Sequence, residues 1–265
     1  MKRLIYQYWT GRMPSYAQVS KELFTSYARD SGAEYLFEQD PRYFRSKYAR
    51  YYNALRPIFD LNFHAYDQVL FVDMDVIPLQ NNDANIFETP IGQIGMVEEV
   101  DQPDLRLNMF GRINHNNDLR WAKVVKKIWG VQVPLDALNR PRVFNSGVVL
   151  YTKTGLQFAR ENFPSVKAYQ YVMTLARLPR FYRLDQNYLG AFVGKHRCDY
   201  SCLASDWNSQ ITSAKTLSGE NLLVDQRTAS SKFIHMQHRG RNEMSQDDVL
   251  SVASGTYNFD AARHF

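Results

Sequence analysis

The run Val69-Leu70-Phe71-Val72 most constrains the fold of this chain, because its four side chains are all apolar and do not alternate with polar ones. A strand with one face in water alternates, whereas a strand buried on both faces is continuously apolar. The run therefore predicts a central strand in a sheet that is covered on both sides. We expect further strands at residues 4–8, 34–37, 94–97, 148–151 and 232–236.

Segments with apolar residues at helical spacing separate these strands. Ser15 can cap a first helix that Gly32 ends. A second amphipathic segment is expected to open at Pro41 and close at Pro57. We expect further helices at residues 118–129, 154–163, 165–177 and 185–193, and a short one after residue 245.

Strands that alternate with helices along the whole length predict an α/β fold with a mostly parallel central sheet flanked by helices. The chain has 265 residues and shows no repeat, low-complexity tract or obvious linker. We therefore expect one domain over residues 1–265, with a core at about 1–240 and a C-terminal tail at 241–265. Ligands in such folds lie beyond the carboxyl ends of the strands, so residues just after each apolar run are the candidates for function.

The bulk composition limits the partners of the chain. A net charge of +5 and a pI near 9.1 favour anionic partners such as nucleotides, phosphates or acidic membrane surfaces. No nucleic-acid-reading motif is present, and no apolar run is long enough for a signal peptide or a membrane span. We expect a cytoplasmic protein without a membrane span, with peripheral membrane contact left open. The oligomeric state is not determined by the sequence.

The two cysteines, Cys198 and Cys202, lie close to His196. Zinc sites usually have four ligands in a tighter pattern, so we interpret these residues as free thiols in a reducing compartment.

Two carboxylates, Asp73 and Asp75, follow the buried run directly. In an extended strand this spacing would place both side chains on one face. Neighbouring carboxylates repel each other unless a cation lies between them, and oxygen ligands suit Mg²⁺ or Mn²⁺. Such a metal can also bind a diphosphate and neutralise it as it leaves. The simpler alternative is a surface loop with two solvated aspartates, which does not explain why both follow so apolar a run.

A second functional interpretation is a phosphatase of the haloacid dehalogenase type. In such enzymes an aspartate that follows a strand attacks the phosphate, and Asp73 would take this role. Asp247-Asp248 could be the later acidic pair of the same motif. However, Val76 and Ile77 replace the glycine and threonine usual in that motif, and the motif lies far from the start of the chain.

Several segments carry recognisable motifs in order, namely Ala49-Arg50-Tyr51, Tyr66 to Asp75, Ile86-Phe87, Phe144 to Leu150, Asp185-Gln186-Asn187 and Phe233 to Met236. Together they resemble the retaining, metal-dependent glycosyltransferases with the glycosyltransferase-A (GT-A) fold, of the glycogenin and bacterial lipopolysaccharide galactosyltransferase type (family eight-like). The resemblance covers roughly residues 1–240.

This resemblance implies a single GT-A (Rossmann-like) domain that moves a hexose from a nucleotide-diphosphate sugar, with uridine diphosphate as carrier, to a glycan or other hydroxyl acceptor with retention. It implies Mn²⁺ rather than Mg²⁺, held by Asp73, Asp75 and His235, with His238 as the alternative ligand. The family's lysine after the histidine is missing here, so Arg239 or Arg241 is expected to contact the phosphates instead.

The resemblance also implies a catalytic pair, Asp185 and Gln186. Asp185 would bind sugar hydroxyls, and Gln186 lies where a nucleophile would be expected. Amides are poor nucleophiles, which favours front-face departure over a covalent intermediate. The alternative role for Asp185 is to cap the following helix.

The remaining substrate-binding candidates come from the same resemblance. Arg50 would reach the donor's sugar or diphosphate, or else form a surface ion pair. Asn145, Ser146 and Gly147 would hydrogen-bond a sugar and allow close backbone approach, or else form a plain turn. Tyr8 and Thr10 are the candidates for contact with the nucleobase of the donor.

We interpret Trp207-Asn208 as core or rim rather than as part of a site. A catalytically inactive nucleotide-sugar-binding protein is a third functional class that stays open.

Overall fold

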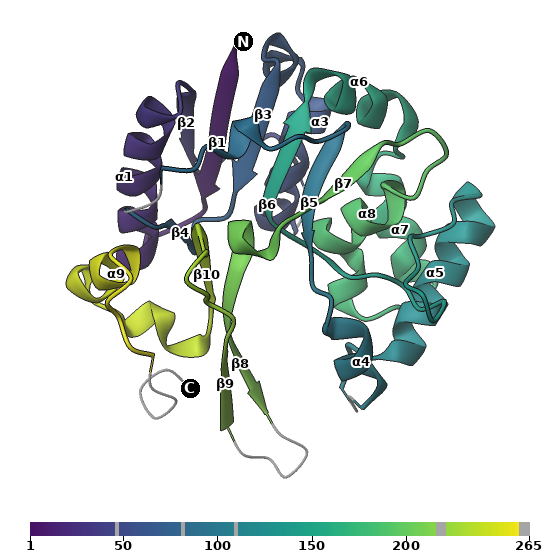
Figure 1. The fold of residues 1–265 in the computed structure, drawn as a ribbon. Coiled ribbons are helices and arrows are strands. Elements are labelled where there is room, and N and C mark those ends of the chain that lie inside the picture. The colour runs from purple at the N-terminus through teal and green to yellow at the C-terminus, as the bar shows by residue number, and fades with distance from the viewer. Residues whose placement is uncertain (46–47, 81–82, 109–110, 216–220, 260–265) are drawn as a thin grey trace. The chain divides into compact units, whose positions relative to one another are not determined.

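The computed structural model describes residues 1–45, 48–80, 83–108, 111–215 and 221–259, and Figure 1 draws its fold. The chain divides into two compact units. The first unit comprises Met1–Pro41, Gln68–Pro90 and Ala204–Phe265, and the second comprises Arg42–Asp67 and Ile91–Leu203. The expectation of one domain over residues 1–265 stays a prediction.

Parallel strands and a helix build one part of the first unit. The strands β2 (Glu34–Gln39) and β3 (Gln68–Val72) both pair in parallel with β1 (Arg3–Trp9), and α1 (Ser15–Asp30) connects β1 to β2. All five residues of β3 are buried. The continuous apolar run therefore does form a strand that is buried along its whole length.

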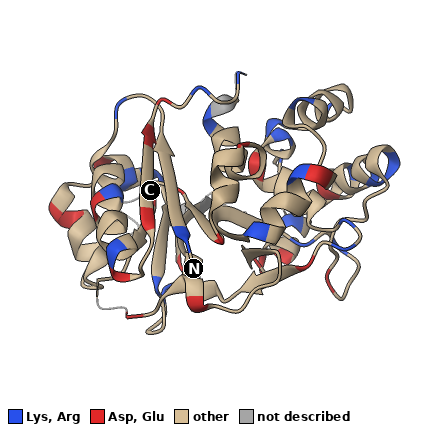
Figure 2. Ribbon diagram, turned by 90° about the horizontal axis from the view of Figure 1, so that it is seen from above, with Lys and Arg blue, Asp and Glu red and all other residues tan. Residues whose placement is uncertain are grey.

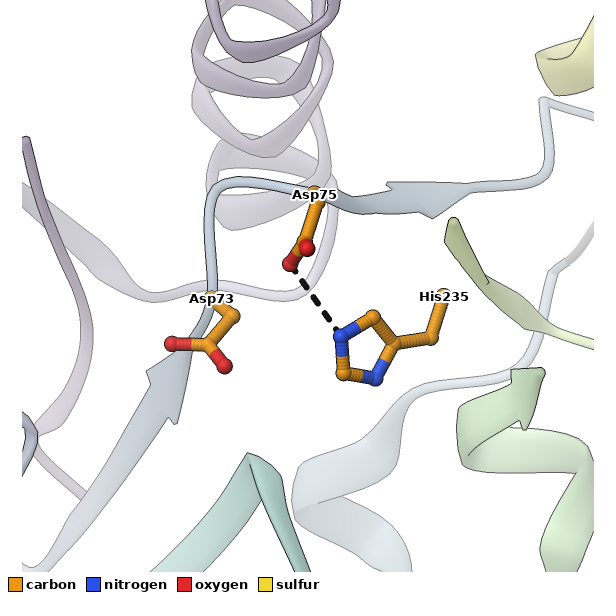
Figure 3. A group of neighbouring side chains, drawn as sticks. All are labelled: Asp73, Asp75 and His235. Carbon is orange, nitrogen blue, oxygen red and sulfur yellow. Dashed lines mark ion pairs between the residues drawn. The ribbon is translucent and has the colours of Figure 1, made fainter. Parts of the chain in front are cut away.

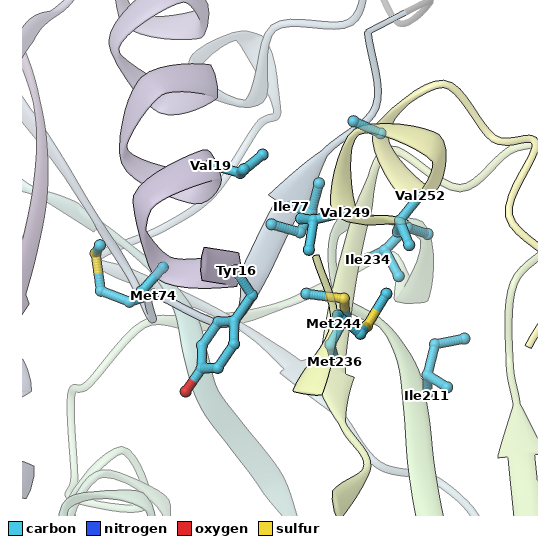
Figure 4. Close-up of a cluster of buried hydrophobic side chains, with 12 residues drawn as sticks. Tyr16, Val19, Met74, Ile77, Ile211, Ile234, Met236, Met244, Val249 and Val252 are labelled. Atoms are coloured by element: carbon cyan, nitrogen blue, oxygen red, sulfur yellow. The ribbon is translucent and has the colours of Figure 1, made fainter. Parts of the chain in front are cut away.

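A second sheet of the first unit has the strand order β4-β10-β8-β9. The strand β10 (Phe233–Gln237) runs antiparallel to β4 (Val76–Pro78) and parallel to β8 (Ser209–Lys215), which pairs with β9 (Asn221–Asp225). A buried apolar cluster in this unit brings together residues of α1, β4 and β10 with the helix α9 (Gln246–Ala253) (Figure 4). The short 3-10 segments of this unit are η3 (Ile86–Glu88), η5 (Ser205–Asn208) and η6 (Arg239–Glu243).

The described residues of the second unit form three strands and most of the helices. The strand β5 (Ile94–Glu98) is antiparallel to β6 (Phe144–Thr152) and parallel to β7 (Tyr200–Leu203). Its α-helices are α2 (Ala49–Tyr52), α3 (Arg56–Phe59), α4 (Gln102–Leu107), α5 (His115–Trp129), α6 (Lys153–Asn162), α7 (Val166–Leu175) and α8 (Asp185–Phe192). Its 3-10 segments are η1 (Asn53–Leu55), η2 (Leu61–Ala65) and η4 (Arg180–Arg183).

The expected fold class is confirmed, because the chain is a mixed α/β protein with mostly parallel strands flanked by helices. Two local expectations and one alternative assignment, the cap role of Asp185, were wrong. The segment between Pro41 and Pro57 is not one helix, because residues 41–45 are not helical, and Pro57 lies in the first turn of α3, where a proline costs no hydrogen bond. Pro14, not Ser15, holds the cap position of α1, and Leu184, not Asp185, that of α8.

Two features bear on the expected environment of the protein. Among the described residues, no helix combines the length and the apolar character that crossing a membrane requires. Cys198 and Cys202 are free cysteines, the first half-buried and the second exposed.

Candidate functional site

The two carboxylates that follow β3 lie on a tight turn. The amide of Val76 donates to the carbonyl of Asp73 at 3.1 Å, which closes a turn over Asp73-Met74-Asp75-Val76. The expectation that an extended strand places both side chains on one face was therefore wrong. The turn, which the apolar β4 follows, brings the carboxylates of Asp73 and Asp75 together instead.

Buried polar side chains hold this turn in place. The amide nitrogen of Gln7, a side chain with no exposed surface, lies 3.1 Å from Ser20 Oγ and 3.3 Å from the carbonyl oxygen of Asp73. The hydroxyl of Ser20 in turn donates to the carbonyl of Val76 at 2.7 Å. Neither residue was predicted from the sequence as part of the site. The available signal was a glutamine in β1 between the apolar and aromatic residues 4–6 and 8–9.

The third predicted ligand, His235, reaches the turn from β10. His235 pairs with Val76 across the β10–β4 ladder, and the amide of Met236 donates to the carbonyl of Asp75 at 2.8 Å. One ligand atom from each of Asp73, Asp75 and His235 lies within 4.8 Å of the others (Figure 3). We call these three residues the Asp-Asp-His group.

The imidazole of His235 is oriented from behind by an amide. Its Nδ1 lies 2.9 Å from Oδ1 of Asn208, in η5, and both side chains are buried. An amide oxygen only accepts, so Nδ1 carries the hydrogen and Nε2 presents its lone pair toward the turn. Nε2 lies 3.1 Å from Asp75 Oδ1. Two such acceptors face each other at this distance only with a proton or another cation between them.

A guanidinium lies beside the same carboxylate. Arg241 Nη2 is 3.5 Å from Asp75 Oδ2, and its Nη1 donates to the carbonyl of His238 at 3.0 Å. Burial opposes ionisation of Asp75, but its interactions with the His235 ring and with the positive charge of Arg241 outweigh this effect and keep the pKa of Asp75 below its usual value. Burial and the charge of Asp75 raise the pKa of Tyr16, whose ring lies 5.7 Å from the Arg241 guanidinium carbon.

The donor set of the Asp-Asp-His group fits a divalent cation. Two carboxylates with one neutral imidazole leave a net charge that a dication balances, with room in its shell for oxygens of a substrate. Mg²⁺ strongly prefers oxygen ligands, whereas Mn²⁺ also accepts imidazole nitrogen. The residues present therefore fit Mn²⁺ at least as well as Mg²⁺.

Three other predicted residues lie in the first unit. His238 is fully buried, and its ring packs at 5.2 Å against that of Phe259, so it is not part of the Asp-Asp-His group. Tyr8 is half-buried and stacks on Phe71 at 5.9 Å. Thr10 is exposed and lies just after β1. Because β1 and β3 are parallel, Thr10 and Asp73 both lie at the carboxyl ends of their strands, on the same edge of the sheet.

The second unit gathers a separate polar group at the start of β6. The register between β5 and β6 shifts at Met96 and Val97, so Ser146 and Gly147 form part of a bulge. Asn145 Oδ1 accepts the amide of Gly147 at 2.8 Å, and its nitrogen donates to Glu99 at 2.7 Å. The segment is thus a bulge inside a strand rather than a plain turn, and bulges re-aim side chains near active sites.

Ser146 links this bulge to the predicted catalytic pair. Its hydroxyl donates to Asp185 Oδ2 at 2.8 Å, and both side chains are buried. Burial raises the pKa of Asp185 to about 6, against the lowering effect of the Ser146 hydrogen bond. A carboxyl group with this pKa is mostly ionised at neutral pH and can accept hydrogen bonds from hydroxyl groups. Asp185 and Gln186 are the first two residues of α8.

Arg50 lies on α2 in the second unit and is exposed. Its Nη2 donates to the hydroxyl of Tyr51 at 3.1 Å, and its guanidinium lies 4.9 Å from the centre of that ring.

The acidic pair Asp247-Asp248 has a structural explanation. Both residues lie in the first turn of α9, where Asp248 and Ser245 form a capping box. Negative charge also stabilises the start of a helix. This pair therefore gives no support to a phosphatase site built on Asp73.

Comparison with known proteins identifies the fold. No family profile matches the chain, and no curated protein matches it. Among solved structures, the chain is similar to galactosyltransferase LgtC in complex with donor and acceptor sugar analogues, with a TM-score of 0.50 and 13% identity over 97% of each chain. It is also similar to an active-site mutant of LgtC, with a TM-score of 0.52 and 12% identity over 97% of each chain. The predicted resemblance in fold to GT-A glycosyltransferases is confirmed.

Proposed function

We propose that the protein is a metal-dependent glycosyltransferase that moves a hexose from a nucleotide-diphosphate sugar to a hydroxyl acceptor. The observation that carries this proposal is the convergence of Asp73, Asp75 and His235 at the carboxyl end of β3, in a chain with the fold of known glycosyltransferases. In α/β folds of this kind, substrates bind beyond the carboxyl ends of the strands, which is where these three side chains converge.

The Asp-Asp-His group would hold the metal, with Mn²⁺ favoured over Mg²⁺ by the imidazole ligand. When bound, the cation would contact the donor's diphosphate and neutralise its charge as it leaves. Asn208 keeps the lone pair of His235 directed at this position, and Gln7 fixes the backbone of Asp73. Arg241, close to Asp75, supplies a guanidinium for the same phosphates. Tyr8 and Thr10 would contact the nucleobase end.

The polar group of the second unit would bind the sugar. The Asp185 carboxylate and the Asn145 amide would hydrogen-bond hydroxyls of the hexose, with Ser146 orienting Asp185. The amide of Gln186 is a weak nucleophile, which favours departure and attack on the same face of the sugar and hence retention. Arg50 is assigned to the donor's sugar or diphosphate.

A donor screen tests this proposal. The protein is incubated with Mn²⁺ and a panel of nucleotide sugars, and nucleotide release is measured. We expect release from a uridine-diphosphate sugar that stops in the presence of a chelator. Release that is unaffected by the chelator would contradict the metal assignment, and absence of release from every donor, with nucleotide still bound, would indicate a binding protein.

The same preparation tests the phosphatase interpretation. We expect no hydrolysis of small phosphate esters and no trapping of beryllium fluoride on Asp73. Robust ester hydrolysis that is lost in Asp73→Asn would overturn the glycosyltransferase proposal.

A further inference from the structure

The positive charge of the chain is concentrated in two segments of the second unit. Residues 111–135 and 162–184 together hold nine Lys and Arg against one Asp, whereas the whole chain has 32 Lys and Arg against 27 Asp and Glu. Figure 2 colours basic residues blue and acidic residues red along the ribbon. The one acidic residue, Asp118, is buried, and its carboxylate lies 2.8 Å from Nη1 of Arg106. The surface of these two segments is therefore strongly basic.

The two segments contain α5 and α7, which are antiparallel neighbours (Figure 1). Near the start of α5, Arg120 Nη2 donates to the carbonyl of Ala176, just after α7, at 3.2 Å. At the end of α5, the ring of Trp129 lies 5.8 Å from that of Tyr169, in the first half of α7. The indole of Trp121 also donates to the hydroxyl of Tyr169 at 2.9 Å. These contacts fix the two helices against each other.

The outer face of α5 carries cations in a row. Arg120, Lys123 and Lys127 are three and four residues apart, and all three are exposed. Side chains at this spacing lie on one face of a helix. The apolar side chain of Ile128, next to Lys127, is also exposed. A basic helix with an apolar border is typical of helices that lie on membrane surfaces.

The outer face of α7 is more apolar. Lys167, Tyr171 and Leu175 follow one another at four-residue spacing and are exposed. Tyr171 retains 65% and Leu175 64% of its accessible surface, although both side chains gain from burial. Exposed apolar residues beside cations indicate a surface that a partner covers. We call the exposed side chains of the two helices the α5–α7 surface: Arg120, Lys123, Lys127, Ile128, Lys167, Tyr171 and Leu175.

The combination of side chains selects among anionic partners. Cations alone would suit any polyanion, including the phosphate backbone of a nucleic acid. An acidic bilayer presents anionic headgroups to Lys and Arg, and directly below them an apolar layer that buries Leu and Ile and suits the amphipathic ring of Tyr. The α5–α7 surface offers both kinds of contact.

We propose that the α5–α7 surface binds the protein to an acidic lipid bilayer. The cations would contact the headgroups, and Ile128, Tyr171 and Leu175 would enter the boundary between headgroups and acyl chains. The proposal does not depend on the proposed glycosyltransferase function, because it concerns different side chains and its test requires no nucleotide release.

The test is co-sedimentation of the full chain with vesicles of phosphatidylcholine, with and without phosphatidylglycerol. We expect binding only when phosphatidylglycerol is present. The double variant Lys123→Gln/Lys127→Gln should lower the partition coefficient about thirty-fold, as expected for two cations near an acidic bilayer. Its matched control is Lys153→Gln/Arg197→Gln, which removes the same charge from exposed positions of the same unit and should keep most of the binding.

The apolar contribution has its own pair of variants. Leu175→Ser should lower the partition coefficient about ten-fold, because its side chain would leave water on binding. Leu61→Ser is the control and should change little, since Leu61 is 61% exposed but lies in η2, outside the α5–α7 surface. Thermal melting checks that every variant is folded.

The remaining outcomes contradict the proposal. Equal binding to both kinds of vesicle, or to neither, would exclude an acidic bilayer as the partner. Equal losses in the two double variants would indicate a diffuse positive field rather than a defined surface. If vesicles do not bind but a labelled DNA duplex does, and Lys123→Gln/Lys127→Gln alone weakens that binding, the surface belongs to a nucleic acid. Self-association that the same variant abolishes, without vesicle binding, would assign it to a second copy of the chain.

Discussion

The Nδ1 atom of His235 lies 2.9 Å from the side-chain oxygen of Asn208, although the two residues are 27 positions apart in the sequence. This contact fixes which imidazole nitrogen carries hydrogen and directs the other toward Asp75. Partners of this kind, behind a metal ligand, set the orientation and basicity of the imidazole. Asn208 is thus a positioning residue for the candidate metal site.

Substitution of Asn208 is expected to weaken metal binding without removing a ligand. Asn208→Leu should lower the affinity for Mn²⁺ about ten- to a hundred-fold, the range typical when a metal-binding histidine loses its hydrogen-bond partner, whereas Asn208→Asp keeps an acceptor and should retain binding. Mn²⁺ affinity is followed by electron paramagnetic resonance, without reference to activity. If Asn208→Leu binds Mn²⁺ as tightly as the wild type, the hydrogen bond does not position His235.

The two histidines of the 235–238 segment should respond differently. His235→Ala removes a predicted ligand and should reduce Mn²⁺-dependent binding of uridine diphosphate about ten- to a hundred-fold. His238→Ala should mainly lower the melting temperature, because its buried ring packs against Phe259. Calorimetry and thermal melting on both variants decide this. Loss of nucleotide binding in His238→Ala alone would mean that the wrong histidine was assigned.

The backbone of Asp73 is expected to depend on Gln7. Gln7→Leu keeps a similar volume but removes the contacts to Ser20 and to the carbonyl of Asp73, leaving buried groups without partners at a cost of about 1–3 kcal/mol. We expect a lower melting temperature together with weaker Mn²⁺ binding. Gln18→Leu, on an exposed position of α1, is the control and should change neither. A destabilised Gln7→Leu variant with unchanged Mn²⁺ affinity would show that this contact stabilises the fold alone.

The raised pKa of Asp185 predicts an opposition between stability and function. Because its folded pKa of about 6 exceeds the unfolded value near 3.8, the folded state binds more protons, and Asp185 lowers stability as pH rises through this interval. Asp185→Asn should therefore stabilise the protein at pH 7.5 by up to roughly 3 kcal/mol and have little effect at pH 4. Urea denaturation at both pH values measures this difference.

The same variant should lose glycosyl transfer, whose rate in the wild type is expected to fall as pH falls through about 6. Ser146→Ala provides the complementary test. It removes a hydrogen bond that favours the charged form, so the pKa of Asp185 should rise further and the pH profile should shift upward. An unshifted profile would mean that Asp185 does not govern the pH dependence.

Much of the fold could be predicted because local patterns decide it. The apolar run 69–72 became the fully buried β3, and the periodic segments gave α1, α5 and α6 close to their expected bounds. The short strands β4, β7, β8 and β9 were missed, because three to seven residues carry too little periodicity without their pairing partners. The segment between Pro41 and Pro57 was expected to be helical, but its described residues form only short helical turns. Aromatic residues at helical spacing can equally be placed there by packing, so their spacing alone does not indicate a helix.

The sequence by itself determined the α/β class and the chemistry of the candidate ligands, since Asp73 and Asp75 were identifiable by residue type and by position after an apolar run, and His235 through the family resemblance. Only the tertiary structure decided how these ligands meet: through a turn rather than an extended strand, with Gln7 holding its backbone and Asn208 orienting the imidazole. The physical reason is that side-chain type and strand burial are local properties, whereas a hydrogen bond between residues far apart in sequence exists only after the chain has folded.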